Sequence, residues 1–408
     1  MRFVILTQYF QPEIGAAQVR LANMTQQLLA NGHEVEVITA MPNYPTGKIF
    51  PKYKKKSYMR EEINGITVHR VWMYAATGAG IKRLLNYTSF MLTAFWGLNR
   101  SKKPDYIFVE SPPLFLGITG YIASKWWGVP FIFNVSDLWP DSIKALGIQK
   151  EGIVLKILEK LERFLYRKAT YVNTLAKGIC DILEQEKNVA KEKILYLPNG
   201  VDVKAFYPMS PDLLWQKNLG LPTDRHIILY AGTHGYAHGL ETLLEAARLL
   251  KDEKILFLCV GGGSEKARIH AEAIAMRLDN MSFWQPQAPE MINRLYSLAT
   301  AGISTFRYSP LLEQTLPAKI LPIMACAKPV LYSGAGEGAE LIKTAKAGIV
   351  TPPEDAPALV EAIRTIINNR EYAQQLGQNG QQYIEQNLQW SSIVKNWLQQ
   401  LGVDKNQH

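Results

Sequence analysis

Cysteine is scarce in this sequence, and the cysteines that it has stand far apart. Cys180, Cys259 and Cys326 are the only three, and no two of them have the Cys-x-x-Cys spacing of a zinc site or a redox pair. Each lies beside apolar residues, which indicates reduced thiols in the core of a cytoplasmic protein. Neither a disulfide framework nor a structural zinc site is therefore indicated.

Long apolar runs and repeats are also missing. The longest apolar segment, residues 84–98, contains Asn86, Thr88 and Ser89, and it is shorter than the ~18–20 residues that span a bilayer. We therefore expect it to lie on or inside the protein. No low-complexity tract or fixed-period repeat interrupts the 408 residues, a length that suits two domains with a core each.

Acidic residues are too few in the first half of the chain to balance the basic ones. Residues 1–200 hold 26 Lys and Arg against 16 Asp and Glu, whereas residues 201–408 hold 19 against 20. A basic surface attracts anionic lipid, nucleic acid or a phosphorylated substrate. No helix-turn-helix, zinc finger or RNA-binding aromatic motif accompanies the charge, so we expect no nucleic-acid partner.

Two segments suggest how the basic half is used. The stretch "GKIFPKYKKKSYMR" concentrates lysines among aromatic residues, and the amphipathic residues 81–99 follow it, opening with Lys82 and Arg83. This combination favours contact with an anionic membrane surface. The alternative is an ordinary solvated face. We expect a cytoplasmic protein that lies on the inner face of the plasma membrane.

Two ligand motifs are absent. The sequence has no Asp-x-Asp, the carboxylate pair that commonly holds a metal-bound nucleotide diphosphate, and residues 13–20 lack a full Gly-x-Gly-x-x-Gly. A dinucleotide-dependent dehydrogenase therefore gains little support. A bound diphosphate would need protein cations and backbone N–H groups to neutralise it, and we expect no metal.

What the sequence does have is a regular alternation of apolar β-branched runs with helical patterns. Alternation of this kind predicts α/β domains with parallel, doubly wound sheets, whose ligands bind beyond the carboxyl ends of the strands. We expect one domain over residues 1–205 and a second over residues 206–385, facing a central cleft. The Trp- and Leu-rich helix near 386–402 is expected to cross back, so that residues 386–408 complete the first domain.

Two glycine motifs follow apolar strands. In "EIGAAQVR", Gly15 and Ala16 open a helix whose free N–H groups can hold a phosphate or a sugar hydroxyl. In "VGGGSEKARI", three glycines that include Gly262 allow a ligand to approach the backbone closely, with Lys266 in the following helix. The alternatives are a plain tight turn at Gly15 and a flexible turn with a solvated lysine at Gly262.

Polar side chains follow two further strands. In "AGTHGYAHGLE", His234 and His238 flank Gly235, and we expect hydrogen bonds to phosphate or sugar rather than a metal, because no third ligand follows. In "NVSDLWPDS", Asp137 and Asp141 come just after a buried strand. A carboxylate there can bind hydroxyls or accept a proton, or cap a helix. We favour function for Asp137 and capping for Asp141.

The order of the motifs resembles a known family. "YLPNGVD" at 196–202, "YAG" followed by "GLE" at 230–241, "VGGGSEK", and "MACAKPVLYS" followed by "GEGAELI" are similar to retaining glycosyltransferase family 4 over nearly the whole chain. The elements "SDLWPDS" and "LPAKI" resemble the bacterial surface-polysaccharide transferases of the fucosamine-transferase type.

The resemblance implies a fold and an activity. The fold would be GT-B, with two Rossmann-like domains and a last helix that returns to the first. The activity would be transfer of a hexose or N-acetylhexosamine from a UDP-sugar, with retention at the anomeric carbon and no cofactor or essential metal. A lipid-linked or saccharide acceptor in surface or envelope polysaccharide biosynthesis is the expected partner.

The resemblance also implies a set of binding residues. Gly15 and Ala16 would lie near the donor phosphates and the acceptor, and Asp137 would take the place of a cleft-facing His or Asp. Gln285, between Trp284 and Pro286, would meet the base. The donor phosphates would meet Gly235, Gly262, Lys266, Lys319 and the N–H groups of Thr315 and Leu316.

The sequence departs from the family pattern at two places. The first loop of the second domain lacks the usual Arg and Lys, so His234, Lys319 or Arg307 must grip the diphosphate. The paired glutamates eight residues apart would fall at Gln314 and Pro322, leaving Glu313 as a neighbour. Pro322 would be tolerated in a helix that begins near Ile320, because a proline in the first turn loses no intrahelical hydrogen bond.

We assign the expected catalysis to two residues. Lys319 would stabilise the diphosphate leaving group, and Asp137 or a donor phosphate oxygen would assist at the sugar and accept the acceptor proton. Two alternatives remain open. One is a degenerate member that binds a nucleotide sugar and scaffolds a membrane assembly complex. The other is a UDP-sugar epimerase with the same fold.

Overall fold

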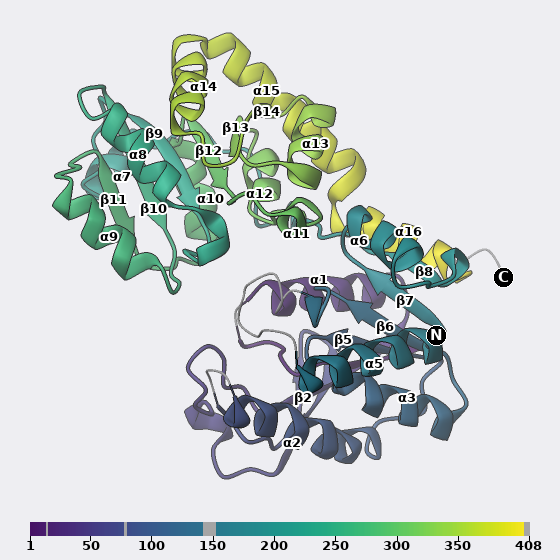
Figure 1. Cartoon of the computed structure of the whole chain (residues 1–408). Coiled ribbons are helices and arrows are strands. Elements are labelled where there is room, and N and C mark those ends of the chain that lie inside the picture. Colours follow the sequence, from purple (N-terminus) through teal and green to yellow (C-terminus); the bar gives the residue numbers. More distant parts are fainter. Residues whose placement is uncertain (14, 77–79, 142–151, 404–408) are drawn as a thin grey trace. The chain divides into compact units, whose positions relative to one another are not determined.

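The structure is a computed structural model that describes residues 1–408 except 14, 77–79, 142–151 and 404–408 (Figure 1). The chain forms two compact units. Unit 1 contains Met1–Pro198 and Ile393–His408, and unit 2 contains Asn199–Ser392. The chain thus passes from one unit to the other at 198–199 and 392–393, seven residues from the boundaries expected at 205 and 386. The two segments pair with each other, since the Val201 N–H donates to the Leu388 carbonyl at 3.1 Å, and both belong to unit 2.

Unit 1 is built on a sheet that has eight strands among the described residues. Their spatial order is β3-β4-β2-β1-β5-β6-β7-β8. The strands are β1 (Arg2–Leu6), β2 (Glu34–Ala40), β3 (Tyr58–Ile63), β4 (Ile66–Val71), β5 (Tyr106–Ser111), β6 (Phe131–Val135), β7 (Tyr171–Thr174) and β8 (Ile194–Tyr196). All pairs are parallel except β3 with β4. The expectation of a purely parallel sheet is wrong at this edge, because the turn Asn64-Gly65 with positive φ at both residues folds the hairpin.

Helices cover both faces of this sheet. They are α1 (Ala16–Ala30), α2 (Ile81–Leu98), α3 (Leu116–Trp127), α5 (Ile153–Lys168) and α6 (Lys177–Gln185). Short 3₁₀ turns lie at Pro51–Tyr53 and Lys191–Lys193. The central strands β1, β5 and β6 are almost entirely buried, as expected of a parallel sheet covered on both sides.

Unit 2 repeats the architecture with six parallel strands in the order β11-β10-β9-β12-β13-β14 among the described residues. The strands are β9 (His226–Ala231), β10 (Ile255–Val260), β11 (Met281–Trp284), β12 (Ala301–Thr305), β13 (Val330–Ser333) and β14 (Gly348–Thr351). The helices are α7 (Leu213–Asn218), α8 (Glu241–Leu249), α9 (Lys266–Ala275), α10 (Pro289–Leu298), α11 (Pro310–Glu313), α12 (Ile320–Ala325), α13 (Gly336–Ala345), α14 (Ala356–Asn368) and α15 (Arg370–Tyr383). A 3₁₀ turn lies at Tyr236–His238, and one π-helical turn at Ile384–Leu388.

Helix α12 begins where the sequence predicts. Its first residue is Ile320, so Pro322 lies in the first turn. The N–H that proline lacks has no intrahelical acceptor at this position. The prediction of a start near Ile320 is therefore confirmed.

The last helix, α16 (Trp390–Gln400), returns to unit 1 as predicted. Trp397 is fully buried there. Its ring centroid lies 6.1 Å from Phe3 and 6.0 Å from Phe108, and its indole N–H donates to Asn173 Oδ1 at 2.8 Å. The doubly wound α/β fold with a helix that crosses back is thus shown. Among the described residues, no helix has both the length and the apolarity needed to cross a membrane.

Candidate functional site

The candidate residues fall into two clusters, one in each unit, and each lies where parallel strands end. In unit 2 the loops after β9 and β10 interlock. The His234 N–H donates to the Gly262 carbonyl at 2.8 Å, and the Glu265 N–H donates to the His234 carbonyl at 2.9 Å. Gly261 has φ +150°, and a Cβ atom there would lie 1.9 Å from the Gly232 carbonyl oxygen. Only glycine fits this close approach of two backbones.

Lys319 lies at the N-terminus of α12, beside the loop after β9. Its Nζ atom contacts the Tyr230 hydroxyl at 2.6 Å and His238 Nδ1 at 3.1 Å, 4.4 Å from the centroid of the Tyr230 ring. Lys319 is partly exposed as a residue, yet burial of its ammonium group lowers its pKa well below the ordinary lysine value. Among the described residues, no carboxylate lies within ion-pair distance of Lys319. When protonated, Lys319 therefore has no carboxylate among these residues to balance its charge.

His238 completes the surroundings of Lys319. Burial lowers its pKa to about 3, and Lys319 acts in the same direction. The imidazole is therefore neutral at physiological pH, and Nδ1 can accept a hydrogen bond from the Lys319 ammonium group. The ring stacks on Phe306 with centroids 5.2 Å apart.

Lys266, the first residue of α9, is also without a carboxylate partner in the described part of the chain, but its donors are occupied. Its Nζ atom donates to the carbonyls of Gly261 at 2.8 Å and Trp284 at 2.7 Å, and lies 3.3 Å from Gln285 Oε1. Three donors thus meet three neutral acceptors. In this conformation Lys266 ties the loop after β10 to the end of β11, and Gln285 is one of its partners.

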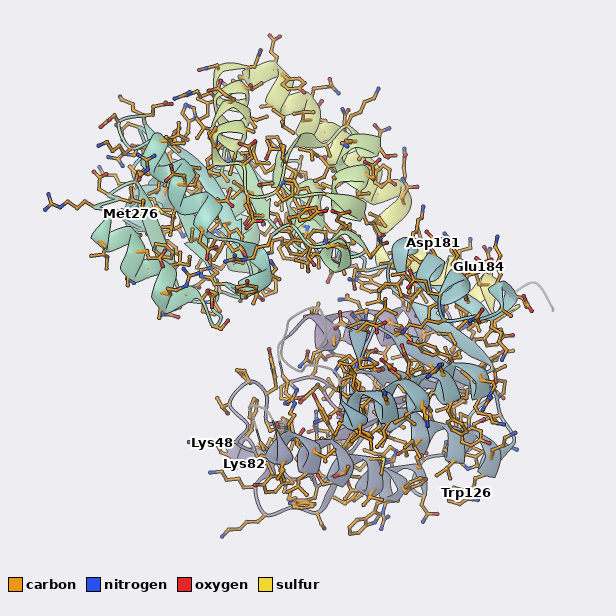
Figure 2. The ribbon with its side chains drawn as sticks, in the orientation of Figure 1. Lys48, Lys82, Trp126, Asp181, Glu184 and Met276 are labelled. Carbon is orange, nitrogen blue, oxygen red and sulfur yellow. The ribbon has the colours of Figure 1, made fainter. Side chains whose placement is uncertain are left out.

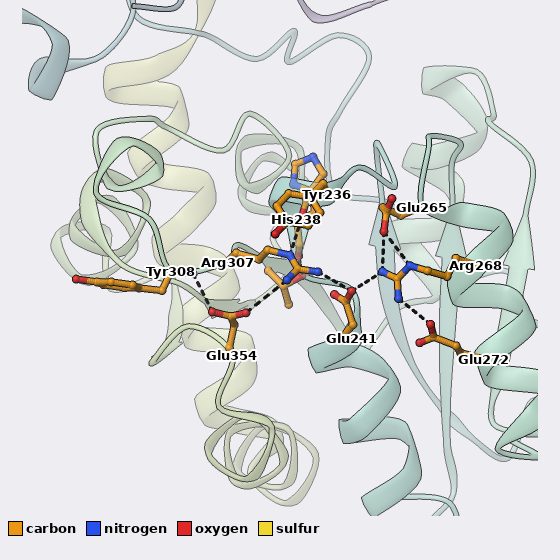
Figure 3. Close-up of polar contacts among 10 residues, drawn as sticks. Tyr236, His238, Glu241, Glu265, Arg268, Glu272, Arg307, Tyr308 and Glu354 are labelled. Atoms are coloured by element: carbon orange, nitrogen blue, oxygen red, sulfur yellow. Dashed lines mark hydrogen bonds and ion pairs between the residues drawn. The ribbon is translucent and has the colours of Figure 1, made fainter. Parts of the chain in front are cut away.

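Arg307, which follows β12, belongs to a network of ion pairs (Figure 3). Its guanidinium donates to Glu241 at 2.5 Å and to the Tyr236 carbonyl at 2.8 Å, and Glu354 lies 3.9 Å away. Glu241 in turn pairs with Arg268, which also binds Glu265 and Glu272. The charge of Arg307 is therefore balanced by carboxylates, unlike that of Lys319.

The side chain of His234, a residue of the loop after β9, is buried inside the protein. Its ring is fully buried, with its centroid 5.4 Å from that of Tyr230, and burial lowers its pKa to about 4. Contrary to the expectation from the sequence, the ring presents no surface to a phosphate. Gly235, by contrast, starts the 3₁₀ turn in an extended conformation, and a Cβ atom there would meet nothing closer than 3.6 Å.

The segment between α11 and α12 holds the remaining candidates. Glu313 is the last residue of α11. Its carbonyl oxygen lies close to Gly336, and a Cβ atom on Gly336 would be 2.0 Å from that oxygen. The Thr315 N–H donates to the Leu312 carbonyl at 3.1 Å. The expectation that this N–H binds phosphate is therefore wrong for the conformation described, since the turn uses it. The role expected of Leu316 stays a prediction.

The cluster of unit 1 is built around a buried ion pair. Gly15 and Ala16 begin α1, and one turn later Arg20 points into the sheet. Its guanidinium pairs with Glu110, near the end of β5, and donates to the Ser136 hydroxyl at 2.7 Å. The two side chains are only 6% and 3% exposed. Burial raises the pKa of the Glu110 carboxyl, and Arg20 acts in the opposite direction.

Asp137 follows Ser136 directly, two residues beyond the end of β6. Its side chain reaches solvent, but the protein around it is dense enough to raise its pKa, and the charge of Arg20 partly reverses this effect. Asp141, by contrast, pairs with Lys187 at 2.6 Å. The N–H groups that Asp141 was expected to cap belong to residues 142–151, outside the described part of the chain.

Sequence reasoning missed Arg20, Glu110 and Tyr230. Arg20 and Glu110 are charged residues on faces that the apolar pattern buries, and charged side chains are almost never fully buried unless paired. That conflict between pattern and charge was the available signal. Nothing in the sequence pairs the two, because they lie 90 residues apart. Within the described residues no cluster of three or more His, Cys, Asp or Glu side chains could hold a metal.

Family models match most of the chain. Residues 15–200 match the model described as "Glycosyl transferase 4-like domain", and residues 213–383 match "Glycosyl transferases group 1". A putative colanic acid biosynthesis glycosyl transferase, WcaI of Escherichia coli K12, is 30% identical over 376 residues, which cover 89% of this chain and 91% of the relative. The chain belongs to the family 4 type of glycosyltransferases.

Solved structures support the GT-B fold of this glycosyltransferase. Sucrose-phosphate synthase from Thermosynechococcus elongatus superposes with a TM-score of 0.78 at 20% identity, covering 98% of each chain. HepE from Anabaena, solved in complex with UDP, superposes with a TM-score of 0.73 at 17% identity. The match covers 98% of this chain and 100% of the HepE chain. At these identities the likeness concerns the fold.

Proposed function

We propose that this glycosyltransferase moves a hexose or N-acetylhexosamine from a UDP-sugar to a lipid-linked or saccharide acceptor, with retention and without a metal, in surface polysaccharide biosynthesis. The name of the Escherichia coli relative and the UDP found in HepE support the pathway and the donor class. UDP-glucose and a UDP-N-acetylhexosamine are the donors that we would test first.

The observation that carries the proposal is that Lys319 has no carboxylate partner among the described residues. A cation that is largely removed from water without a carboxylate is costly, and a diphosphate would supply the missing negative charge. Of the three residues that could replace the missing Arg and Lys of the family, Lys319 alone is neither paired with a described carboxylate nor fully buried. Arg307 is neutralised by Glu241 and Glu354, and His234 is buried and neutral.

The reaction assigns a role to each cluster. The bond between the anomeric carbon and the diphosphate oxygen breaks, its electron pair stays on UDP, and Lys319 stabilises that charge. The acceptor oxygen then bonds to the anomeric carbon on the face that UDP leaves. Its proton passes to a phosphate oxygen or to Asp137, whose raised pKa suits a proton acceptor.

The test is a panel of UDP-sugars incubated with the purified protein in EDTA, with lipid-linked and free saccharide acceptors. We expect UDP release and sugar transfer that Lys319→Met abolishes. UDP binding without turnover on any acceptor would favour the degenerate binding protein, and conversion of the donor without an acceptor would favour the epimerase. No binding and no release with any nucleotide sugar would refute the proposal.

A surface of unit 1 fits the membrane on which a lipid-linked acceptor would lie. On α2, the exposed residues Ile81, Leu85, Leu92 and Trp96 repeat at helical spacing, and the neighbouring α3 exposes Ile122 and Trp126. Exposed lysines border these residues at positions 82, 102, 103 and 125. Figure 2 shows Lys82 and Trp126 at the outside of unit 1. Apolar side chains bordered by cations suit an anionic lipid surface.

Sedimentation with lipid vesicles tests this part of the proposal. We expect binding to vesicles that contain anionic phospholipid, weaker binding to neutral ones, and loss of binding in a Leu92→Glu/Trp126→Glu variant. Ile274→Glu is the matched control, because Ile274 is an equally exposed apolar residue of unit 2. Equal binding by the variant and the control would contradict a role for the α2–α3 surface.

A further inference from the structure

A continuous chain of buried hydrogen bonds joins the crossing helix to the candidate site of unit 1. Trp397 on α16 donates to Asn173 Oδ1, and the Asn173 amide donates to Asn134 Oδ1 at 2.5 Å. The Asn134 amide donates to Glu110 Oε2 at 2.7 Å and reaches the Ser136 hydroxyl at 3.0 Å. The chain ends at the pair formed by Glu110 and Arg20.

Each link of this chain is buried and directional. Asn134 and Asn173 are 0% exposed, so each would lose its partner at a cost if a neighbour moved. Glu110 receives donors from Arg20, Ser136 and Asn134, which leaves its carboxylate little freedom to rotate. The guanidinium of Arg20 is consequently held at one place beside the loop that carries Asp137.

We infer that Arg20 and Glu110 are positioning residues for Asp137: Glu110 fixes the guanidinium of Arg20, and Arg20 presents a stationary positive charge to the Asp137 carboxylate. The inference rests on the proposed function, in which Asp137 is a proton acceptor. Its physical content is independent of activity, because the charge of Arg20 acts on Asp137 whether or not substrate is present.

The other charges near Asp137 are accounted for within the described residues. Arg20 on α1 is the charged group that acts on Asp137, and Glu110 on β5 faces Arg20. Asp141 is paired with Lys187, which also binds Glu162 of α5 at 3.0 Å. Changing Arg20 or Glu110 therefore alters the surroundings of Asp137 without breaking that second cluster.

The two residues should move the pKa of Asp137 in opposite directions. Glu110→Gln keeps the shape of the side chain and leaves Arg20 uncompensated, so the Asp137 carboxylate is favoured and its pKa falls. Arg20→Met/Glu110→Gln removes both charges without leaving either one buried alone, so the pKa rises, because Arg20 is the charge that lowers it. Arg20→Lys keeps a positive charge beside Glu110, so the pKa of Asp137 should stay closer to the wild-type value than in the double variant.

The experiment follows the side-chain carboxyl carbon of Asp137 by NMR in full-length protein labelled with ¹³C-aspartate, with Asp137→Asn to assign the signal. Arg2→Met/Glu34→Gln is the matched control, because it removes an ion pair of the same unit that is partly exposed. We expect opposite shifts in the two Glu110 variants and none in the control. Shifts of one sign, or none, would overturn the inference.

A second measurement separates positioning from a purely structural role. The acidic limb of the kcat/KM profile for UDP-sugar turnover should follow the NMR pKa of Asp137 in each variant. An acidic limb that stays in place while the pKa moves would show that Asp137 is not positioned for the reaction. If the wild type turns over no donor while the opposite shifts appear, the proposed function fails and the electrostatic coupling of Arg20 to Asp137 stands.

Discussion

Arg20 in unit 1 and Lys319 in unit 2 are both cations near the ends of parallel strands, and their surroundings are opposite. Arg20 in unit 1 is paired with a buried carboxylate and a serine hydroxyl. Lys319 in unit 2 contacts a tyrosine hydroxyl and a neutral histidine, with no carboxylate among the described residues. A cation that is paired with a carboxylate contributes to the fold, whereas a cation without such a partner can bind an anionic ligand favourably.

The difference supports our proposal that Lys319 takes the place of the basic residues that the family resemblance leads us to expect in the first loop of unit 2. The position of Lys319 on α12 brings its Nζ atom to the loop after β9, where a Cβ atom on Gly232 would lie 3.1 Å from the lysine stem. The cation thus reaches the loop from another element. Four predictions test the contrast between the two sites.

The largest expected effect is on stability in unit 1. Arg20→Met leaves Glu110 buried without its partner, and loss of one member of a buried pair typically costs ~3–5 kcal/mol. Urea unfolding of the whole chain would measure it. The exposed control Arg2→Met should cost no more than about 1 kcal/mol. Equal effects of the two variants would mean that the buried pair does not stabilise unit 1 as the contrast requires.

In unit 2 the same kind of substitution should have the opposite consequence. Lys319→Met removes a charge that no carboxylate compensates, so the ligand-free protein should be as stable as the wild type or more stable. UDP affinity, measured by calorimetry, should fall about 10- to 150-fold, as expected for a hydrogen bond to a charged group worth ~1.5–3 kcal/mol. Arg307→Met serves as the comparison and should lose less, because Arg307 is balanced by Glu241. A larger loss of UDP affinity with Arg307→Met would mean that Arg307, rather than Lys319, is the main cation for the diphosphate.

The lowered pKa of Lys319 predicts a pH dependence of UDP binding. A diphosphate favours the charged lysine, so binding raises its pKa and draws a proton from solution wherever free Lys319 is partly neutral. Affinity should therefore fall as pH rises, and the fall should come below pH ~10.4, where ordinary lysines titrate. Calorimetry in buffers of different ionisation enthalpy would detect the proton uptake. The dependence should vanish in Lys319→Met, and its persistence there would assign it to another group.

The smallest effect is expected at Pro322. By resemblance, this position on α12 carries a glutamate that holds the ribose in relatives, and the proline is partly exposed in the first turn of the helix. Pro322→Glu should tighten UDP binding by less than about tenfold, the worth of one net hydrogen bond. Unchanged or weaker binding would show that the position does not face the ribose.

Much of the fold was predictable because it rests on local patterns. Helix α1 begins at Ala16 after the Gly15 loop, α9 follows the three glycines and contains Lys266, and α12 begins at Ile320. The antiparallel β3 and the crossings at 198–199 and 392–393 were not predicted. Val201 and Leu388, near these crossings, pair with each other, and no local pattern reports a pairing across that distance in the sequence.

The sequence alone determined the two-domain α/β class, the positions of the glycine loops and the set of cations that could meet a phosphate, because periodicity and backbone sterics act over a few residues. Only the tertiary structure decided which of those cations is free. Arg307 is neutralised by Glu241 from 66 residues away, and Arg20, which sequence reasoning missed, is neutralised by Glu110 from 90 residues away. Whether a charge is compensated depends on which residues are its neighbours in space. Among the described residues, the fold places no carboxylate beside Lys319.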